Sequence, residues 1–329
     1  MTATLLPPEL AETEASPRAG ADALPGGPTP AIRTSGLTKR YGGLTAVSGL
    51  SIEIPRGVVA GFVGPNGSGK TTTIRMILSM IRPTEGSAEV LGVDTRHPIG
   101  YLPRVGALIE GPAFYPTLSG RRNLRVLSSL GGYSPVRVEE VLEIVGLADR
   151  AGDHVASYSM GMKQRLGIAA ALLPKPELLV LDEPANGLDP AGILEMRRLI
   201  LELSRHGVTV FISSHLLAEV EQIADWIVML NKGRLLFQGP IDAVLSQRET
   251  QLVVAAEDPA DLGRLAALLR SAGHSAHVID GRLHVDAEAS FAAELNRSAM
   301  SAGITLVEIG TNRATLEDTF LAMTAGETR

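Results

Sequence analysis

Gly64-Pro65-Asn66-Gly67-Ser68-Gly69-Lys70-Thr71 is the stretch of this chain that decides its fold. It matches the phosphate-binding pattern Gly-x-x-x-x-Gly-Lys-[Ser/Thr] at every fixed position. The apolar residues 58–63 before it predict a buried strand, and residues 72–81 after it carry apolar side chains at helical spacing. Because strand, glycine-rich loop and helix follow in order, the sequence predicts a nucleotide-binding site.

Each part of this loop suits a polyphosphate. Glycines let the backbone wrap the anion, and the N–H groups of the loop and of the following helix point at its oxygens. Lys70 adds a positive charge near the terminal phosphates, and Thr71 offers its hydroxyl to Mg²⁺. A glycine-rich turn with a solvent-facing lysine is the disfavoured alternative. The predicted nucleotide-binding residues of this segment are Gly64, Pro65, Asn66, Gly67, Ser68, Gly69, Lys70, Thr71 and Thr72.

Composition bounds the class of protein. With 329 residues, 45% of them hydrophobic and 20% charged, the chain is an ordinary globular sequence with room for about two domains. The net charge of -6 gives no reason to expect a nucleic-acid partner. The chain contains no cysteine, which excludes disulfides and thiolate metal sites and agrees with a reducing compartment.

No segment predicts a membrane span or a secretory signal. The most apolar run, residues 166–181, is broken by Pro174, Lys175, Pro176 and Glu177, whereas a span needs about 18–20 uninterrupted apolar residues. Residues 1–30 contain six prolines and four acidic residues against one arginine. Such a composition cannot bury a core, so we expect a disordered tail there and a cytosolic chain.

A second motif is Leu178-Leu179-Val180-Leu181-Asp182-Glu183-Pro184, a buried strand that ends in two carboxylates. Open α/β sheets bind ligands at the carboxyl ends of their strands, where Asp182 suits Mg²⁺ and Glu183 can polarise a water. The next predicted strand, 208–215, ends in His215, which we expect at the same edge of the sheet. A lone histidine at a strand end is otherwise usually structural.

Four further residues carry weaker signals. Tyr41 lies upstream of the loop and could stack on a purine ring, although alone it suggests a packed strand residue. Glu110 ends the predicted strand 105–110, where a carboxylate is usually a solvated turn residue. Ser159 and Gly161 precede a predicted helix, and by itself such a serine is an N-cap.

The pattern of predicted helices and strands changes at about residue 250. Predicted elements follow in the order β-α-β-β-α-β, which is a ferredoxin-like split unit. This segment has no paired carboxylates, metal-ligand spacing or second phosphate loop, so we assign it an accessory role. An amphipathic stretch over 316–323 predicts a final helix.

With these motifs in this order, the chain resembles the ATP-binding cassette (ABC) transporter ATPases from about residue 32 to residue 245. The resemblance implies an α/β P-loop NTPase domain over 31–248, with a helical insertion at about 111–165. The small α+β ferredoxin-like domain then occupies 249–329.

The resemblance also implies roles for single residues. Tyr41 corresponds to the adenine-stacking aromatic, and Gly64 to Thr71 form the Walker A loop. Asp182 is the Walker B aspartate, Glu183 the catalytic base and His215 the switch histidine. Catalysis is thereby assigned to Glu183, His215 and Lys70, and Mg²⁺ binding to Thr71, Asp182 and Glu110.

Two positions depart from the family pattern. Tyr158-Ser159-Met160-Gly161-Met162 stands where the family signature is Leu-Ser-Gly-Gly-Gln, so only Ser159 and Gly161 are kept as γ-phosphate contacts. Glu110 stands at the Q-loop glutamine position and keeps a side-chain oxygen for Mg²⁺ or water. Asp189 corresponds to the D-loop acid. The segments 106–120, 158–165 and 316–320 look like the subgroup related to bacitracin and daunorubicin exporters.

The resemblance therefore implies an ATP-hydrolysing subunit that powers efflux of a drug, antibiotic or peptide. Its implied partners are a separate polytopic membrane permease and a second copy of itself. The two copies of the chain would bind head to tail and sandwich ATP and Mg²⁺ between them. The implied location is the cytoplasmic side of the cell membrane. The alternative is a soluble regulatory ABC ATPase acting on ribosomes or DNA, which one cassette without sustained heptads disfavours. A small-molecule kinase is disfavoured by Ser159, Gly161 and His215.

Overall fold

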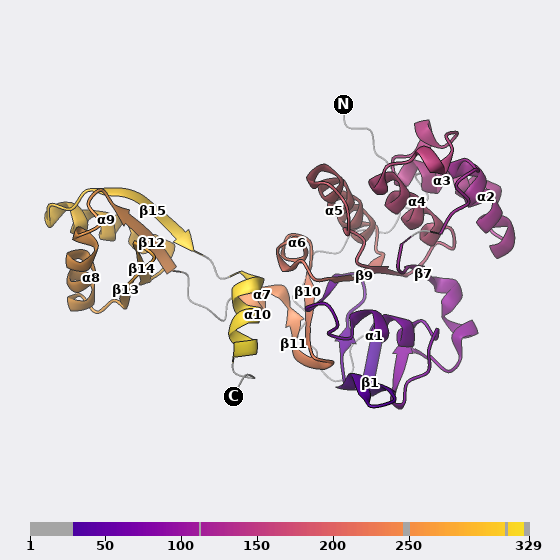
Figure 1. The fold of residues 1–329 in the computed structure, drawn as a ribbon, viewed down its shortest axis with the longest axis horizontal. Helices are drawn as coiled ribbons and strands as arrows, with labels where there is room; N and C mark the ends of the chain where they lie inside the picture. Colours follow the sequence, from indigo (N-terminus) through magenta and orange to yellow (C-terminus); the bar gives the residue numbers. More distant parts are fainter. Residues whose placement is uncertain (1–28, 112, 246–250, 313–314, 326–329) are drawn as a thin grey trace. The chain divides into compact units, whose positions relative to one another are not determined.

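A computed structural model describes residues 29–111, 113–245, 251–312 and 315–325 (Figure 1). The chain divides into two compact units, of which the first ends at Ile241 and the second begins at Asp242. The predicted domain boundary between residues 248 and 249, and the predicted tail apart from its last two residues, lie outside the described part. Within that part, no helix combines the length and apolarity needed to cross a membrane.

The first unit is built on a six-stranded sheet of order β11-β10-β4-β9-β8-β7. All neighbouring pairs are parallel except β10 and β11. The three central strands are buried along their whole length, as expected for a parallel sheet covered on both faces. The strands are β4 (Val59–Val63), β7 (Val105–Leu108), β8 (Leu178–Asp182), β9 (Thr209–Ser214), β10 (Trp226–Asn231) and β11 (Arg234–Pro240).

A second, antiparallel sheet of order β2-β1-β5-β6, with β3 paired to β1, belongs to the same unit. Helix α1 (Lys70–Ile77) joins the two sheets, because its Ile74 and Ile77 share one buried cluster with Leu37 of β1 and Phe62 of β4. The strands of this sheet are β1 (Ile32–Tyr41), β2 (Leu44–Leu50), β3 (Glu53–Ile54), β5 (Glu85–Val90) and β6 (Val93–Asp94).

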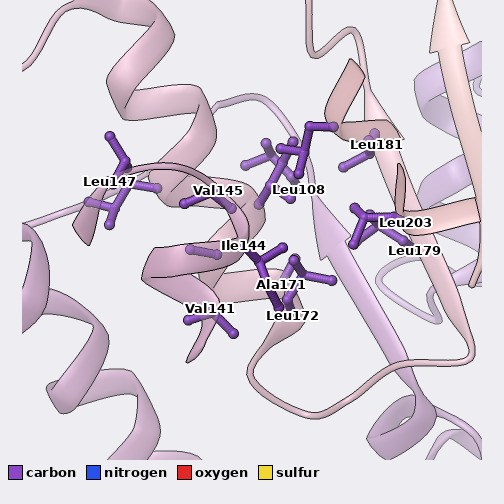
Figure 2. Packing of buried hydrophobic residues seen from close by; sticks show 14 of the residues in the cluster. Leu108, Val141, Ile144, Val145, Leu147, Ala171, Leu172, Leu179, Leu181 and Leu203 are labelled. Atoms are coloured by element: carbon purple, nitrogen blue, oxygen red, sulfur yellow. The ribbon is translucent and has the colours of Figure 1, made fainter. Parts of the chain in front are cut away.

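A helical segment lies between β7 and β8, as the sequence predicts. Its helices are α2 (Gly120–Gly131), α3 (Pro135–Ile144) and α4 (Met160–Leu172). The side chains of Ser119 and Ser134 accept hydrogen bonds from backbone N–H groups in the first turns of α2 and α3, and so begin these helices. In Figure 2 the helices pack on the sheet through a buried cluster that includes Leu108, Val141 and Leu179. Each such buried side chain contributes about 1.5–3 kcal/mol of transfer free energy.

The remaining helices of the first unit follow β8 and β9. They are α5 (Pro190–Arg205) and α6 (Leu217–Glu221), and α7 (Ile241–Leu245) begins at the last residue of the unit. Short 3-10 turns occupy residues 98–100, 102–104, 148–150 and 155–157.

The second unit has the predicted β-α-β-β-α-β order. Its sheet is antiparallel with the order β13-β14-β12-β15, and its core contains Leu252, Leu265 and Leu283. The elements are β12 (Gln251–Ala256), α8 (Asp261–Ser271), β13 (Ala276–Ile279), β14 (Arg282–Asp286), a 3-10 turn (Ala289–Phe291), α9 (Ala292–Ser301), β15 (Leu306–Asn312) and α10 (Leu316–Ala325). The final helix predicted from the amphipathic stretch is therefore present.

Candidate nucleotide-binding site

Three neighbouring parallel strands bring the predicted motifs to one edge of the six-stranded sheet. In the order β4-β9-β8, Val63 is paired with Ser214, and Ser213 is paired with Asp182. The glycine-rich loop begins directly after β4. Glu183 is the first residue after β8, and His215 is the first residue after β9. Because parallel strands end at the same edge, residues far apart in the sequence meet there.

The loop itself has no room for larger residues at two of its glycines. A Cβ on Gly64 would lie 2.3 Å from the carbonyl oxygen of Leu230. Gly69 has a φ of +102°, and a Cβ on it would lie 2.6 Å from the carbonyl oxygen of Ala46. Helix α1 starts at the next residue and has no acidic side chain in its first turn. Its N-terminal N–H groups therefore offer an uncompensated positive end to an anion.

One buried hydroxyl in the loop supports this fit to a phosphate. The Oγ atom of Ser68 is buried and has no hydrogen-bond partner among the described residues. Buried polar atoms in proteins are nearly always paired, so an unpaired hydroxyl indicates a ligand or water that completes it. Ser68 is one of the residues that the loop motif predicts to bind nucleotide.

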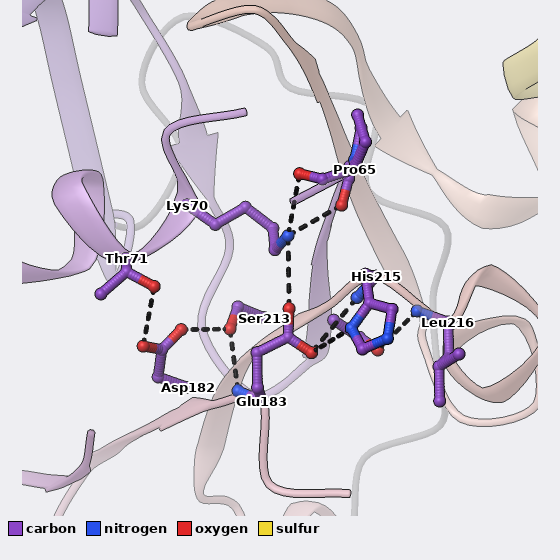
Figure 3. Close-up of polar contacts among 10 residues, drawn as sticks. Pro65, Lys70, Thr71, Asp182, Glu183, Ser213, His215 and Leu216 are labelled. Carbon is purple, nitrogen blue, oxygen red and sulfur yellow. Dashed lines mark hydrogen bonds and ion pairs between the residues drawn. The ribbon is translucent and has the colours of Figure 1, made fainter. Parts of the chain in front are cut away.

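Lys70 is held over the loop by oxygen atoms. Its Nζ donates to the carbonyl oxygens of Gly64 at 2.7 Å and Pro65 at 3.3 Å. The same atom lies 3.2 Å from Oε1 of Glu183 (Figure 3). The lysine side chain is only 5% exposed, so this charge is fixed in place at the mouth of the loop.

Thr71 and Asp182 form the part of the site that suits a metal ion. Thr71 Oγ1 donates to Asp182 Oδ2 at 2.9 Å, and Ser213 Oγ donates to the other carboxylate oxygen at 2.5 Å. A hydroxyl and a carboxylate are the hard oxygen donors that Mg²⁺ prefers. In the described ranges no three His, Asp or Glu side chains form a metal-binding group. One carboxylate still fits Mg²⁺, which commonly takes one or two of them together with waters and substrate phosphates.

Glu183 lies between a lysine and a histidine. Its Oε1 faces Lys70, and its Oε2 lies 2.8 Å from Nδ1 of His215 and accepts the His215 backbone N–H at 3.3 Å. The backbone φ of Glu183 is +50°, in the left-handed region. For a residue with a side chain, such a conformation costs about 1–3 kcal/mol and persists only where neighbours impose it. The carboxylate is thus aimed toward Lys70 and His215 rather than left free.

Among the described residues, two other predicted site residues, Tyr41 and Glu110, make no side-chain contact with this cluster at the strand ends. Tyr41 ends β1 with 47% of its surface exposed, and Lys39 Nζ lies 5.1 Å from its ring centroid. Strand β7 ends at Leu108, and Glu110 lies beyond it with a φ of +57°, its exposed carboxylate paired with Arg75 of α1. The expected metal role of Glu110 therefore has no support from these contacts, because its carboxylate is engaged by Arg75.

Ser159, Gly161 and Asp189 lie at helix starts. Ser159 is exposed and caps α4 by accepting the N–H of Met162 at 3.2 Å, and Gly161 is in the first turn of that helix. Asp189 is also exposed and caps α5 by accepting the N–H of Gly192 at 3.0 Å. The side chains of Ser159 and Asp189 are therefore at the surface, where each also accepts an N–H group of its own helix.

Sequence reasoning missed Ser213, which contacts both acidic residues of the site. Its hydroxyl bonds Asp182, and it accepts the N–H of Glu183 at 3.0 Å. The available signal was its place two residues before His215, at the end of a strand. Only the pairing of β8 with β9 shows that it lies opposite Asp182.

Known proteins resemble this chain over most of its length. A family model described as ABC transporter matches residues 47–186. The bacitracin transport ATP-binding protein of Bacillus licheniformis is 40% identical over 304 residues, which cover 90% of this chain and 98% of that protein. The daunorubicin resistance ATP-binding protein of Streptomyces coeruleorubidus is 35% identical over 91% of this chain and 97% of its own length.

Solved structures give the same result for about two thirds of the chain. The ADP conformation of an ATP-binding cassette of an ABC transporter has a TM-score of 0.60 and 26% identity, and covers 66% of this chain and 95% of its own. The sheets and helices of this chain therefore have the architecture of an ATP-binding cassette.

Proposed function

The chain belongs to the ABC transporter ATP-binding proteins, and on that premise we propose that it hydrolyses ATP to power export of an antibiotic through a separate membrane permease. The observation that carries the proposal is the cluster of Lys70, Thr71, Asp182, Glu183 and His215 at one edge of the sheet. The bacitracin and daunorubicin relatives, aligned over nine tenths of the chain, give the class of transported compound.

Binding of ATP rests on the loop and on Tyr41. The N–H groups of the loop, the start of α1 and the Lys70 ammonium receive the phosphates, and the exposed Tyr41 ring offers a face for adenine. Thr71 and Asp182 would hold Mg²⁺, which neutralises charge on the β- and γ-phosphates when it is bound.

Hydrolysis rests on Glu183. Its carboxylate takes a proton from the attacking water, whose oxygen bonds to the γ-phosphorus while the bond to the ADP oxygen breaks. His215 orients that carboxylate through the contact at Nδ1. A bound phosphate competes with Glu183 for the Lys70 ammonium, so we expect nucleotide binding to free Oε1 of Glu183 for the water.

A second copy of the chain completes the site in this proposal. Ser159 and Gly161 are not part of the cluster in their own chain, but they lie at the accessible start of α4, where N–H groups can receive a γ-phosphate. With ATP present, the Glu183→Gln variant should double in mass by light scattering. Ser159→Arg added to it should prevent this, whereas Ser134→Arg, at the exposed N-cap of α3, should not. An unchanged mass in every variant would contradict the dimer.

This chain has a surface at α2 that suits binding of the permease. A groove of about 580 Å³ is bordered by apolar and basic side chains, and Leu130 is 81% exposed. Exposed apolar groups rimmed by charges are typical of protein interaction sites. The residues that line this groove are Leu118, Arg122, Arg125, Val126, Ser129 and Leu130. We infer that a cytoplasmic segment of the permease binds there and holds the chain at the cell membrane.

Co-purification from membranes of the native host tests the exporter function. The tagged chain should recover a polytopic membrane protein, and Leu130→Asp should reduce that recovery while leaving nucleotide binding intact. Recovery on ribosomes, without a membrane protein, would contradict the exporter function and favour the regulatory alternative.

A further inference from the structure

Ser213 joins the two acidic residues of the site through one hydroxyl group. It is fully buried at the end of β9, and strand pairing places it directly opposite Asp182. Its Oγ donates to Asp182 Oδ1 at 2.5 Å and accepts the backbone N–H of Glu183 at 3.0 Å. A serine hydroxyl has a single proton, so the donor role is used on Asp182 and a lone pair is used on Glu183.

The first of these bonds divides the Asp182 carboxylate between two tasks. Oδ1 is occupied by Ser213, and Oδ2 accepts the hydroxyl of Thr71. Rotation of the carboxylate would break both bonds. Ser213 therefore keeps Oδ2 on the side of Thr71, where the metal donors are.

The second bond acts on the backbone of Glu183. The N–H of Glu183 bonds to both the Oγ and the carbonyl oxygen of Ser213, the latter at 3.2 Å. This N–H belongs to the residue whose φ is +50°, which is the conformation that directs the Glu183 carboxylate to Lys70 and His215. Loss of the hydroxyl leaves the N–H of Glu183 with only the longer of its two bonds.

The neighbouring serine shows that the arrangement is specific to position 213. Ser214 is also buried, but its Oγ accepts the N–H of Leu216, at the start of α6. Successive residues of a strand point to opposite faces, so only one of the two serines can face Asp182. Of the two serines, Ser213 is therefore the one that bonds the carboxylate of Asp182.

We propose that Ser213 is a positioning residue for ATP hydrolysis: it holds Asp182 ready for the metal ion and Glu183 ready for the water. The proposal rests on the ATPase function above. It assigns to one side chain an effect on both metal affinity and turnover. Removal of a residue that hydrogen-bonds a metal ligand typically lowers metal affinity or activity by about 10–100-fold.

The test uses the full chain with three substitutions at position 213. Ser213→Ala removes the hydroxyl. Ser213→Thr and Ser213→Val introduce branched side chains of the same shape, which differ only in that valine has a methyl group where threonine has the hydroxyl. We expect Ala and Val to lower kcat about 10–100-fold, with little change in the KM for ATP. They should weaken Mn²⁺ binding by a similar factor, measured by electron paramagnetic resonance with a non-hydrolysable ATP analogue. The kcat and the Mn²⁺ affinity of Ser213→Thr should stay within about threefold of those of the unchanged chain.

A matched control lies on the same strand. Thr209 is buried at the opposite end of β9, and its hydroxyl accepts the N–H of Gly57 at 2.9 Å. Thr209→Val therefore removes a buried hydroxyl far from the site, and should lower the melting temperature without changing kcat or Mn²⁺ affinity. Equal kcat and Mn²⁺ affinity in the Thr and Val variants would overturn the role of Ser213. An unchanged chain that neither binds nor hydrolyses ATP would instead overturn the ATPase function itself.

Discussion

The two units of the chain each contain a sheet with polar residues, yet their polar groups are arranged differently. In the first unit the parallel strands β4, β9 and β8 end together, and Lys70, Asp182, Glu183 and His215 converge. In the second unit the strands are antiparallel, so their carboxyl ends alternate between two edges. The difference shows that strand direction, rather than residue type, gathers the chemical groups into one site.

Polar residues of the second unit are instead paired across the sheet. His277 lies opposite His284, Gln251 opposite Asp286, and Arg282 forms an ion pair with Glu308 at 3.0 Å. Hydrogen bonds from Ser275 and Gln251 lower the pKa of Asp286 below its ordinary value. These contacts satisfy the side chains within the sheet, which agrees with an accessory role for this unit.

Removal of one cation from each unit should show the largest difference between them. Lys70→Ala removes a buried charge that bonds two loop carbonyls and faces Glu183, so we expect kcat/KM for ATP to fall about 10³-fold. Arg282→Ala removes a cation that is 52% exposed, and should leave kcat/KM unchanged. Steady-state hydrolysis assays of both variants make the comparison. Similar losses in the two would show that the second sheet shares in catalysis.

A core substitution in the second unit should affect its stability but not hydrolysis. Leu283 is fully buried in that core, so Leu283→Ala should lower the free energy of unfolding of this unit by at least about 2 kcal/mol. Urea unfolding followed by hydrogen exchange measures this loss, and the ATPase rate measured without denaturant should not change. A parallel fall in that rate would indicate that the second unit supports the site.

The smallest effect is expected at the other end of β8, where Glu177 precedes the strand. A hydrogen bond from Arg104, together with the nearby Arg56, lowers the pKa of Glu177 from its ordinary value of 4.5. The carboxylate therefore stabilises the fold above pH 4.5, and this contribution is lost as the pH falls through the lowered pKa.

Glu177→Gln should accordingly lower the free energy of unfolding by less than about 1 kcal/mol at pH 7, because both side chains of the Arg104–Glu177 ion pair are accessible to solvent. The difference in free energy of unfolding between the unchanged chain and the variant should shrink below pH 4.5. The substitution should not change the rate of hydrolysis at neutral pH. Urea titrations at several pH values check this. A difference that grows as the pH falls would contradict the ion-pair explanation.

Much of this arrangement could be predicted because its signals are local in the sequence. The loop 64–71 and the strand that ends in Asp182 and Glu183 are continuous motifs, and the buried strands are apolar along their length. Ser213 could not be predicted because its role depends on which strand lies beside which.

Glu110 illustrates a second limit of the sequence. Spacing predicted a strand through residue 110, but β7 ends at Leu108 and Glu110 takes a left-handed conformation beside Arg75. A contact between a loop residue and a helix 35 positions away leaves no pattern in the sequence. The roles of Ser159 and Gly161 need a second chain and therefore stay predictions.

The most direct test of the central claim, that the strand-end cluster is an ATP-hydrolysing site, is the Glu183→Gln variant. The amide keeps the shape of the side chain but cannot accept a proton as the carboxylate does. We predict that the variant binds ATP and Mg²⁺ with nearly unchanged affinity, measured by calorimetry, while kcat falls by about 10²-fold or more. An unchanged rate of hydrolysis in this variant would contradict the assignment of Glu183 and with it the account of the site.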